Sequence, residues 1–269
     1  TGQGSLLVAA AGGEHPFLNP QERMDIMDAS VEAASGEVPV LSSIQHTDTR
    51  VIVQLARHAE KVGIVGAQLS PLYYYTPSEG DVLRLFQHVS SESNVTLMIY
   101  HTWWRGLNMS WDLLGQLSEL PSVRAVKWGA QNEPTFREGV QKLSKSLVVV
   151  DNHGDPIWSH VLGGTAFVTH IGAFWPEYLV NIWHLLEIHD YVGVKDALVK
   201  FKWEWARWRA KVELVTGGEG PFIKAAMEAV GLKAGPPRPP SIRLPSDLIS
   251  ELIELMDRAG VPRVETDTK

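Results

Sequence analysis

Cysteine is missing from all 269 residues of the sequence. This absence excludes disulfide bonds, thiolate nucleophiles and cysteine metal sites, and it fits the cytoplasmic location that we expect. Basic residues are also few: 24 Lys and Arg stand against 31 Asp and Glu, for a net charge of −7, and no long basic run occurs. Because phosphate binding needs a concentrated cationic face, we expect neither nucleic acid nor an anionic membrane as a partner.

Long hydrophobic runs are lacking as well, and none is long enough to span a bilayer. The opening SLLVAAAGG resembles a signal-peptide core, but it has no basic leader and passes directly into patterned sequence. We interpret it as a buried strand. Hydrophobic residues make up 44% of the chain and charged residues 20%, which is typical of a globular protein with a sizeable core.

Short apolar runs alternate with longer helical patterns over most of the chain, which predicts right-handed βαβ units and a parallel sheet. The predicted strands are Ser5–Ala11, Val38–Ile44, Gly66–Ser70, Val95–Tyr100, Val123–Trp128, Leu147–Asp151 and Thr165–Ile171. The predicted helices between them are Pro20–Ser35, Asp48–Val62, Ser78–Ser91, Ser110–Glu119, Glu133–Ser144 and Pro156–Leu162. The strands are apolar along their length, as expected when both faces of a sheet are covered.

A closed (β/α)₈ TIM barrel and an open doubly wound sheet both fit this alternation. No GxGxxG sequence follows the first strand and no Walker A sequence occurs, which weakens the nucleotide-binding open sheet. We therefore predict an α/β fold with a TIM barrel. Seven strands are one too few, and Thr1–Gly4 reads like the end of a helix and a turn. We expect a first βα unit to be absent from the given chain and to precede Thr1.

After Gly172 the pattern is helical throughout, so we predict a C-terminal helical extension. The predicted helices are Pro176–His189, Val192–Val215, Pro221–Val230 and Ser246–Ala259. The expected organisation is one structural unit with two regions, a catalytic barrel at 1–172 and the last barrel helix with the extension at 173–269.

Residues suited to carbonyl chemistry stand at the predicted carboxyl ends of the strands, where a parallel barrel has its active site. Lys127 ends the apolar run RAVKW, and Tyr100 and Arg105 lie in YHTWWR. A buried amine of lowered pKa attacks a carbonyl to form a Schiff base, a phenol moves protons, and a guanidinium binds a carboxylate. A lone lysine at a strand end is usually solvated, but the combination favours chemistry on a keto acid.

The segment DNHGD, Asp151–Asp155, has one histidine between acids. This spacing is poor for a metal site, and a turn at the strand end is the simpler interpretation. We predict no metal and no organic cofactor.

Several motifs, in this order, resemble the dihydrodipicolinate synthase / N-acetylneuraminate lyase family of class I, Schiff-base-forming aldolases and lyases, which are barrels. AAGGE stands where that family has a GxxGE loop for the pyruvyl carboxylate, and YYYTP matches its tyrosine-rich segment. IYHTWWRG matches its tyrosine strand end, AVKWGA its lysine strand, and GGTAFVTHIGAFWPE its Gly-rich segment before the last helix. The resemblance runs to about Gly172 and is weaker beyond.

The resemblance implies three catalytic residues. Lys127 would form the imine, Tyr100 would move protons at it, and Tyr74 would be a second relay tyrosine, often placed at a subunit interface. It also implies a set of substrate-binding residues, with Arg105 on a distal carboxylate: Ala11, Gly12, Gly13, Trp103, Trp104, Arg105 and Val168. The implied partners are a small 2-keto acid, an aldehyde, and further copies of the chain in a homodimer or homotetramer.

Two departures from the family pattern bear on the substrate. Ala11 and Gly12 stand where the family has Thr or Ser hydroxyls, which argues against the lysine-pathway synthase. Trp103 and Trp104 are bulkier than the residues typical of the family, which predicts an aromatic pocket that prefers a bulky or aromatic partner over aspartate semialdehyde.

The sequence thus predicts a lyase or aldolase that cleaves or forms a carbon–carbon bond of a pyruvate-type 2-keto acid. Two alternatives stay open. One is a dehydratase of 2-keto-3-deoxy sugar acids that uses the same imine. The other is a non-catalytic member of the family that binds a keto acid or serves as a scaffold.

Overall fold

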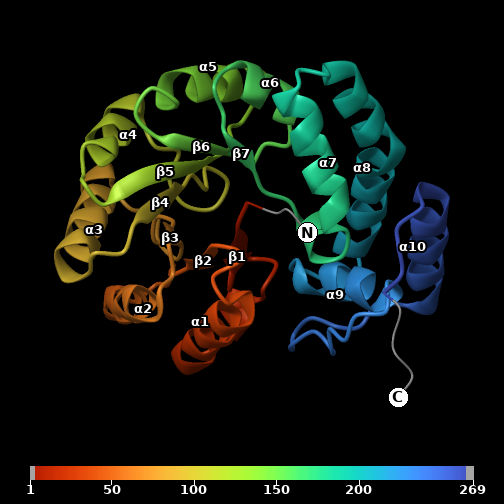
Figure 1. The fold of residues 1–269 in the computed structure, drawn as a ribbon. Helices are drawn as coiled ribbons and strands as arrows, with labels where there is room; N and C mark the ends of the chain where they lie inside the picture. The colour runs from red at the N-terminus through yellow and green to blue at the C-terminus, as the bar shows by residue number, and fades with distance from the viewer. Residues whose placement is uncertain (1–3, 265–269) are drawn as a thin grey trace. The chain divides into compact units, whose positions relative to one another are not determined.

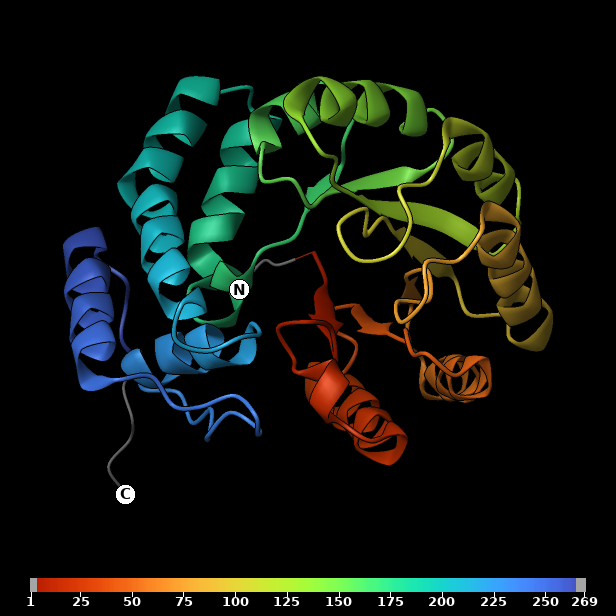
Figure 2. The same ribbon diagram turned by 180° about the vertical axis from the view of Figure 1, so that it is seen from behind.

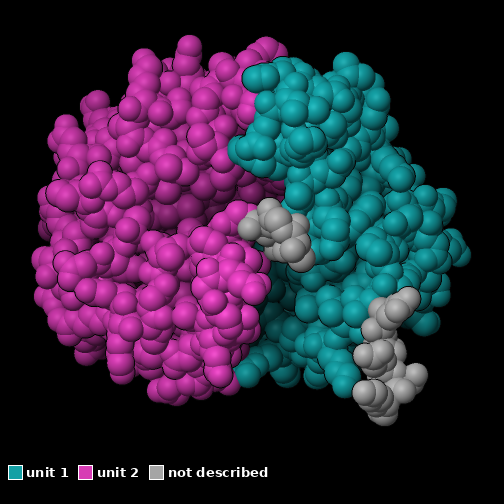
Figure 3. Space-filling model, viewed as in Figure 1, with its two compact units in different colours: residues 1–3, 11–17, 170–269 teal, residues 4–10, 18–169 magenta. Residues whose placement is uncertain are grey.

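The computed structural model describes residues 4–264 and contains two compact units (Figure 3). The sheet unit comprises residues 4–10 and 18–169, and the helical unit comprises residues 11–17 and the chain from 170 onward. Of the predicted helix end at Thr1–Gly4, residues 1–3 lie outside the described part.

The sheet unit contains seven parallel strands that pair in sequence order, so all seven predicted strands are confirmed. They are β1 Leu6–Val8, β2 Val40–Ser43, β3 Gly66–Leu69, β4 Leu97–Tyr100, β5 Val123–Trp128, β6 Val148–Asp151 and β7 Ala166–Phe167. Within residues 4–264, β1 and β7 are the two edges of the sheet. A further strand ahead of Thr1 stays a prediction.

One α-helix follows each of the first six strands, as the alternation in the sequence predicts. These helices are α1 Pro20–Ala34, α2 Thr49–Val62, α3 Glu79–Glu92, α4 Trp111–Ser118, α5 Glu133–Leu143 and α6 Pro156–Val161. Figures 1 and 2 show that the sheet is curved and that these helices cover its outer, convex side. Two of them begin at capping boxes, Asn19 with Glu22 and Ser78 with Asp81, which satisfy backbone N–H groups of the first turn.

The last strand is shorter than the sequence predicts. The prediction extends to Ile171, whereas β7 ends at Phe167 and a 3₁₀ turn, η2, spans His170–Ala173. Because β7 lies at an edge, β6 is its one strand partner among the described residues. The sequence of a strand with a single partner does not show at which residue the pairing with that partner ends.

The core of the sheet unit lies between the strands and the outer helices. Strand residues on this side include Leu69, Ile99, Val126 and Val149, and they pack against Phe86, Val89, Leu114, Phe136 and Val140 of the helices. Because successive strand residues point to opposite faces, Tyr100 and Lys127 point to the concave face. The fold therefore places both on the side that the helices leave uncovered.

The helical unit contains the predicted C-terminal helices and the short turn η1, His15–Phe17. Its helices are α7 Pro176–Glu187, α8 Tyr191–Glu213, α9 Gly220–Ala229 and α10 Ser246–Ala259. Trp205 and Trp208 of α8 are buried in it, whereas Trp203 is exposed. No helix in the described part of the chain is both long enough and apolar enough to cross a membrane.

Candidate active site

The centre of the candidate site is the pair formed by Lys127 and Tyr100. The two residues are paired in register at the carboxyl ends of β5 and β4, and the Lys127 side chain is buried at 6% exposure. Its Nζ lies 4.1 Å from the centroid of the Tyr100 ring, within the range of a cation–π contact. The structure thus brings together an amine shielded from bulk water and a phenol, as the sequence predicts.

A row of aromatic rings continues from this pair. The ring of Trp104 lies 6.0 Å from that of Tyr100, and the ring of Trp103 lies 5.6 Å from that of Trp104, both edge to face. A tight turn follows Tyr100, because the Thr102 carbonyl accepts the N–H groups of Arg105 and Gly106, each at 3.0 Å. We call Tyr100, Trp104 and Trp103 the aromatic row.

For three other predicted site residues, Arg105, Val168 and Tyr74, the described contacts are with residues other than Lys127 and Tyr100. The Arg105 side chain is exposed, and its role in substrate binding stays a prediction. Val168 follows β7 and donates its N–H to the Asp151 carbonyl at 3.1 Å, and its contact with substrate also stays a prediction.

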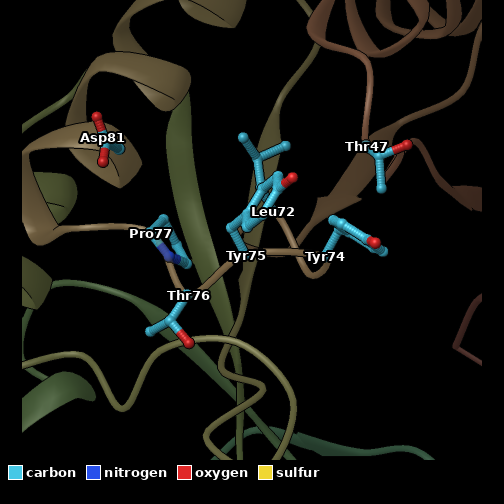
Figure 4. Close-up of a pocket in the computed structure, with 7 residues that line it drawn as sticks. All are labelled: Thr47, Leu72, Tyr74, Tyr75, Thr76, Pro77 and Asp81. Atoms are coloured by element: carbon cyan, nitrogen blue, oxygen red, sulfur yellow. The ribbon is translucent and has the colours of Figure 1, made fainter.

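Tyr74 lies in the segment between β3 and α3 with its side chain 78% exposed. Its ring meets that of Tyr75 edge to face at 4.8 Å. Figure 4 shows Tyr74 among the residues that line a hollow of about 450 Å³, together with Thr47, Leu72, Tyr75, Thr76, Pro77 and Asp81. The proton-relay role of Tyr74 stays a prediction.

The loop Ala11–Gly13 belongs to the helical unit, and its approach to Lys127 stays a prediction. Gly12 packs closely against α9, since a Cβ atom there would lie 2.6 Å from Cδ1 at the end of the Ile223 side chain. A hydroxyl-bearing residue at this position would require Ile223 to move. The Ile223 side chain of α9 thus lies where a hydroxyl-bearing side chain at position 12 would lie.

A buried glutamate fixes the end of the same loop. Glu14 Oε2 lies 2.6 Å from Nζ of Lys224, and its Oε1 accepts the N–H of Arg238 at 3.2 Å. The Glu14 N–H donates to the Ala11 carbonyl at 3.1 Å. These contacts hold the loop against α9 and the segment after it.

A polar cluster that the sequence did not predict lies beside Gly12. His170 Nε2 lies 2.9 Å from Oε2 of Glu219, and its Nδ1 lies 3.5 Å from Nη1 of Arg209. Because a guanidinium only donates, Nδ1 is the acceptor and Nε2–H donates to Glu219. Three residues so far apart in the chain give no sequence signal of this arrangement.

The sequence analysis also missed His101, the residue after Tyr100. Its side chain is 1% exposed, its Nδ1 lies 2.7 Å from the Gly129 carbonyl oxygen, and its Nε2 accepts the Met109 N–H at 3.3 Å. Burial lowers the pKa of His101 below its usual value, so the ring is neutral at pH 7. Strand alternation was an available signal, because it places His101 and Trp128 on the same face.

Asp151, in the segment DNHGD, closes a turn. Its Oδ1 accepts the N–H groups of His153 at 2.7 Å and Gly154 at 2.9 Å. Within residues 4–264, no group of three or more His, Asp or Glu side chains is arranged to hold a metal ion.

The chain is similar to proteins of one family over nearly its whole length. The sequence profile of the Dihydrodipicolinate synthetase family matches residues 1–258. One relative is 4-hydroxy-tetrahydrodipicolinate synthase 1 of Halalkalibacterium halodurans. It is 25% identical over 253 residues, which cover 91% of this chain and 82% of the relative.

Solved structures show the same fold. YagE, a prophage protein of the dihydrodipicolinic acid synthase family from E. coli K12, crystallised in complex with pyruvate, matches with a TM-score of 0.87 and 20% identity over 97% of this chain and 88% of its own. A catalytic lysine mutant of Ruminococcus gnavus sialic acid aldolase matches with a TM-score of 0.83 and 16% identity over 95% of this chain and 85% of its own. The curved parallel sheet is therefore TIM-barrel-like, and the chain belongs to the dihydrodipicolinate synthetase family.

Proposed function

We propose that this protein is a Schiff-base-dependent lyase or aldolase that acts on a pyruvate-type 2-keto acid. The observation that carries the proposal is the buried amine of Lys127, whose Nζ lies 4.1 Å from the Tyr100 ring centroid at the carboxyl end of β5. Membership of a family of lyases and aldolases supports it, and so does the pyruvate bound in the structure of the related YagE.

The reaction would begin with attack of the uncharged Lys127 nitrogen on the keto carbon. A proton moves from nitrogen to oxygen, water leaves, and a protonated imine remains. In the cleavage direction, the bond that breaks joins the methylene carbon next to the imine carbon to the hydroxyl-bearing carbon beyond it. Its electron pair moves toward the imine to give an enamine, and the hydroxyl proton of the departing carbon is lost as that carbon becomes an aldehyde. Protonation of the enamine carbon and hydrolysis of the imine by one water molecule then release the keto acid and restore the Lys127 amine. Synthesis is the reverse.

Tyr100 would move the protons in these steps. Its ring lies beside Nζ of Lys127, so its phenol belongs to the immediate surroundings of the imine. Burial also serves the imine, because a site that excludes water slows its hydrolysis and strengthens local electrostatic interactions.

Borohydride reduction in the presence of several 2-keto acids tests the proposal directly. Reduction of a pyruvate imine should increase the intact mass of the protein by that of pyruvate less one oxygen atom, and peptide mapping should place it on Lys127. Absence of an adduct with every keto acid would refute the enzymatic function and leave the non-catalytic alternative.

We do not propose the lysine-pathway synthase, because Ala11 and Gly12 supply no side-chain hydroxyl in this loop. A dehydratase of 2-keto-3-deoxy sugar acids would form the same imine and then expel water. Loss of water from a sugar acid without release of pyruvate would identify that reaction.

Tyr100→Phe should lower turnover by about 10²- to 10⁴-fold, the range for loss of a general acid–base group. The ring beside Lys127 remains in this variant, so the borohydride adduct should still form, more slowly. The matched control is Tyr178→Phe, since Tyr178 is a buried tyrosine whose hydroxyl donates to the Ala197 carbonyl at 2.9 Å. Equal turnover of Tyr100→Phe and the unaltered protein would remove Tyr100 from the mechanism.

We also expect a homodimer or homotetramer. Tyr73, Tyr74 and Tyr75 are consecutive and exposed, an unusual amount of aromatic surface for a segment in water. Light scattering should give the mass of two or four chains, and Tyr75→Glu should reduce it. Leu214→Glu, at an exposed position of the helical unit, should leave the mass unchanged. A strict monomer would contradict this expectation.

A further inference from the structure

Directly behind the candidate site, the residues after Tyr100 and Lys127 pack against each other. The rings of His101 and Trp128 stack with centroids 4.5 Å apart and an interplanar angle of 17°. Trp128 is itself fixed on α5, because its Nε1–H donates to the Phe136 carbonyl at 3.0 Å. A Cβ atom on Gly139 would lie 2.3 Å from its ring. The indole is therefore a rigid support for the imidazole.

The two ring nitrogens of His101 have different hydrogen-bond roles. The Met109 N–H can only donate, so Nε2 accepts it, and Nδ1 therefore carries the proton that is donated to the Gly129 carbonyl. A neutral imidazole with this tautomer satisfies both contacts, and the Asn108 side chain, in the same segment as Met109, is a further hydrogen-bond neighbour of the ring. Neither Phe nor any acid reproduces the donor and the acceptor together.

These two contacts reach two different segments of the chain. Gly129 lies two residues after Lys127 and directly follows β5. Met109 lies where the segment that carries Trp103, Trp104 and Arg105 returns to the sheet and α4 begins. The His101 backbone N–H also donates to the Lys127 carbonyl at 3.2 Å. One residue thus joins the lysine strand, the tyrosine strand and the segment of the aromatic row.

We propose that His101 is a positioning residue that holds Lys127 through Gly129 and holds the 102–109 segment through Met109, with Trp128 as its support. The inference rests on the proposed function, because His101 acts through Lys127 and the aromatic row and does not touch the substrate. Its two nitrogens serve two steps. The Nδ1 contact sets the rate of imine formation, and the Nε2 contact sets the binding of the aldehyde partner.

Three variants separate these roles. His101→Phe keeps the stacking on Trp128 and removes both hydrogen bonds. His101→Asn keeps a donor near the position of Nδ1, and His101→Gln keeps an acceptor near the position of Nε2. The measurements are the single-turnover rate of borohydride-trapped imine formation with pyruvate and the KM for the aldehyde.

Loss of a partner for a buried polar group weakens a site by about tenfold or more. We expect His101→Phe to slow imine formation and to raise the KM for the aldehyde, each by about tenfold. Asn should restore the imine rate alone, and Gln should restore the KM alone. The two polar variants carry the test if His101→Phe does not fold.

His58→Gln is the matched control, since His58 is a largely buried histidine of α2 whose Nε2 lies 2.7 Å from Oδ1 of Asp28. It should change neither quantity. If the unaltered protein forms the imine and His101→Phe equals it in rate and KM, the positioning role is wrong and the proposed function stands. Equal losses in the Asn and Gln variants would also overturn it. An unaltered protein that forms no imine with any keto acid would remove the proposed function, and the positioning role with it.

Discussion

Replacement of Lys127 by Ala should abolish the borohydride-trapped adduct and lower turnover by at least about 10⁴-fold, as expected when a covalent nucleophile is removed. Every step of the proposed reaction passes through the imine, so no residual route within the site replaces the amine. The side chain is buried beside Tyr100, and water that enters the space left by Ala cannot act as an electron sink. Intact mass after reduction and steady-state turnover measure the two effects.

Lys142→Ala is the matched control for this prediction. Nζ of Lys142 lies 4.6 Å from the centroid of the Trp111 ring, so it contacts an aromatic ring much as Lys127 does, but its side chain is 49% exposed. If burial in the site selects the reactive lysine, this variant should keep the full adduct. A label that maps to Lys142, or that persists in Lys127→Ala, would show that the amine was assigned to the wrong lysine.

Much of the fold is predictable because its signals are local. The capping boxes at Asn19 and Ser78 mark helix starts within a few residues of sequence, and the apolar strand runs report burial on both faces. The end of β7 was not predictable, since Thr165–Ile171 contains no glycine or proline to mark a strand end, while the pairing with β6 stops at Phe167. The end of strand pairing depends on both paired segments, so the sequence of one segment does not determine it.

The candidate site divides in the same way. Lys127 and Tyr100 were predictable as neighbours, because each ends a strand and consecutive parallel strands place their carboxyl ends together. Strand alternation could have placed the His101 ring beside Trp128, but not its contact with Met109, because Met109 reaches Nε2 through a loop whose path the sequence does not show. The tight space at Gly12 depends on Ile223, far along the chain. Contacts of this kind need the three-dimensional structure.

Trp104→Ala should lower kcat/KM for aromatic aldehydes by about 10- to 100-fold. The aromatic row begins at the amine, since Tyr100 lies beside Nζ of Lys127 and Trp104 lies beside Tyr100. Trp104 is 44% exposed, so an apolar partner placed on it removes ring surface from water. Burial of one such group contributes about 1.5–3 kcal/mol, which corresponds to this range of kcat/KM. Trp103→Ala should have a smaller effect, because Trp103 contacts the row through Trp104.

Turnover of small polar aldehydes should change little in either variant, because they gain little from an apolar surface and because the predicted charge-assisted contact of Arg105 with an acid group is unaltered. Trp158→Ala is the control for general loss of an indole. Trp158, on α6, is 43% exposed and packs against the Arg137 guanidinium of α5, so its removal should leave the preference intact. Two results together would contradict a role of the aromatic row in substrate choice. They are efficient turnover of aspartate semialdehyde, and an unchanged ratio of kcat/KM for aromatic and polar partners in both Trp103→Ala and Trp104→Ala. A fall confined to aromatic partners, larger for Trp104 than for Trp103, would instead place the aldehyde along the row, with its carbonyl carbon facing the enamine carbon of the keto acid bound to Lys127.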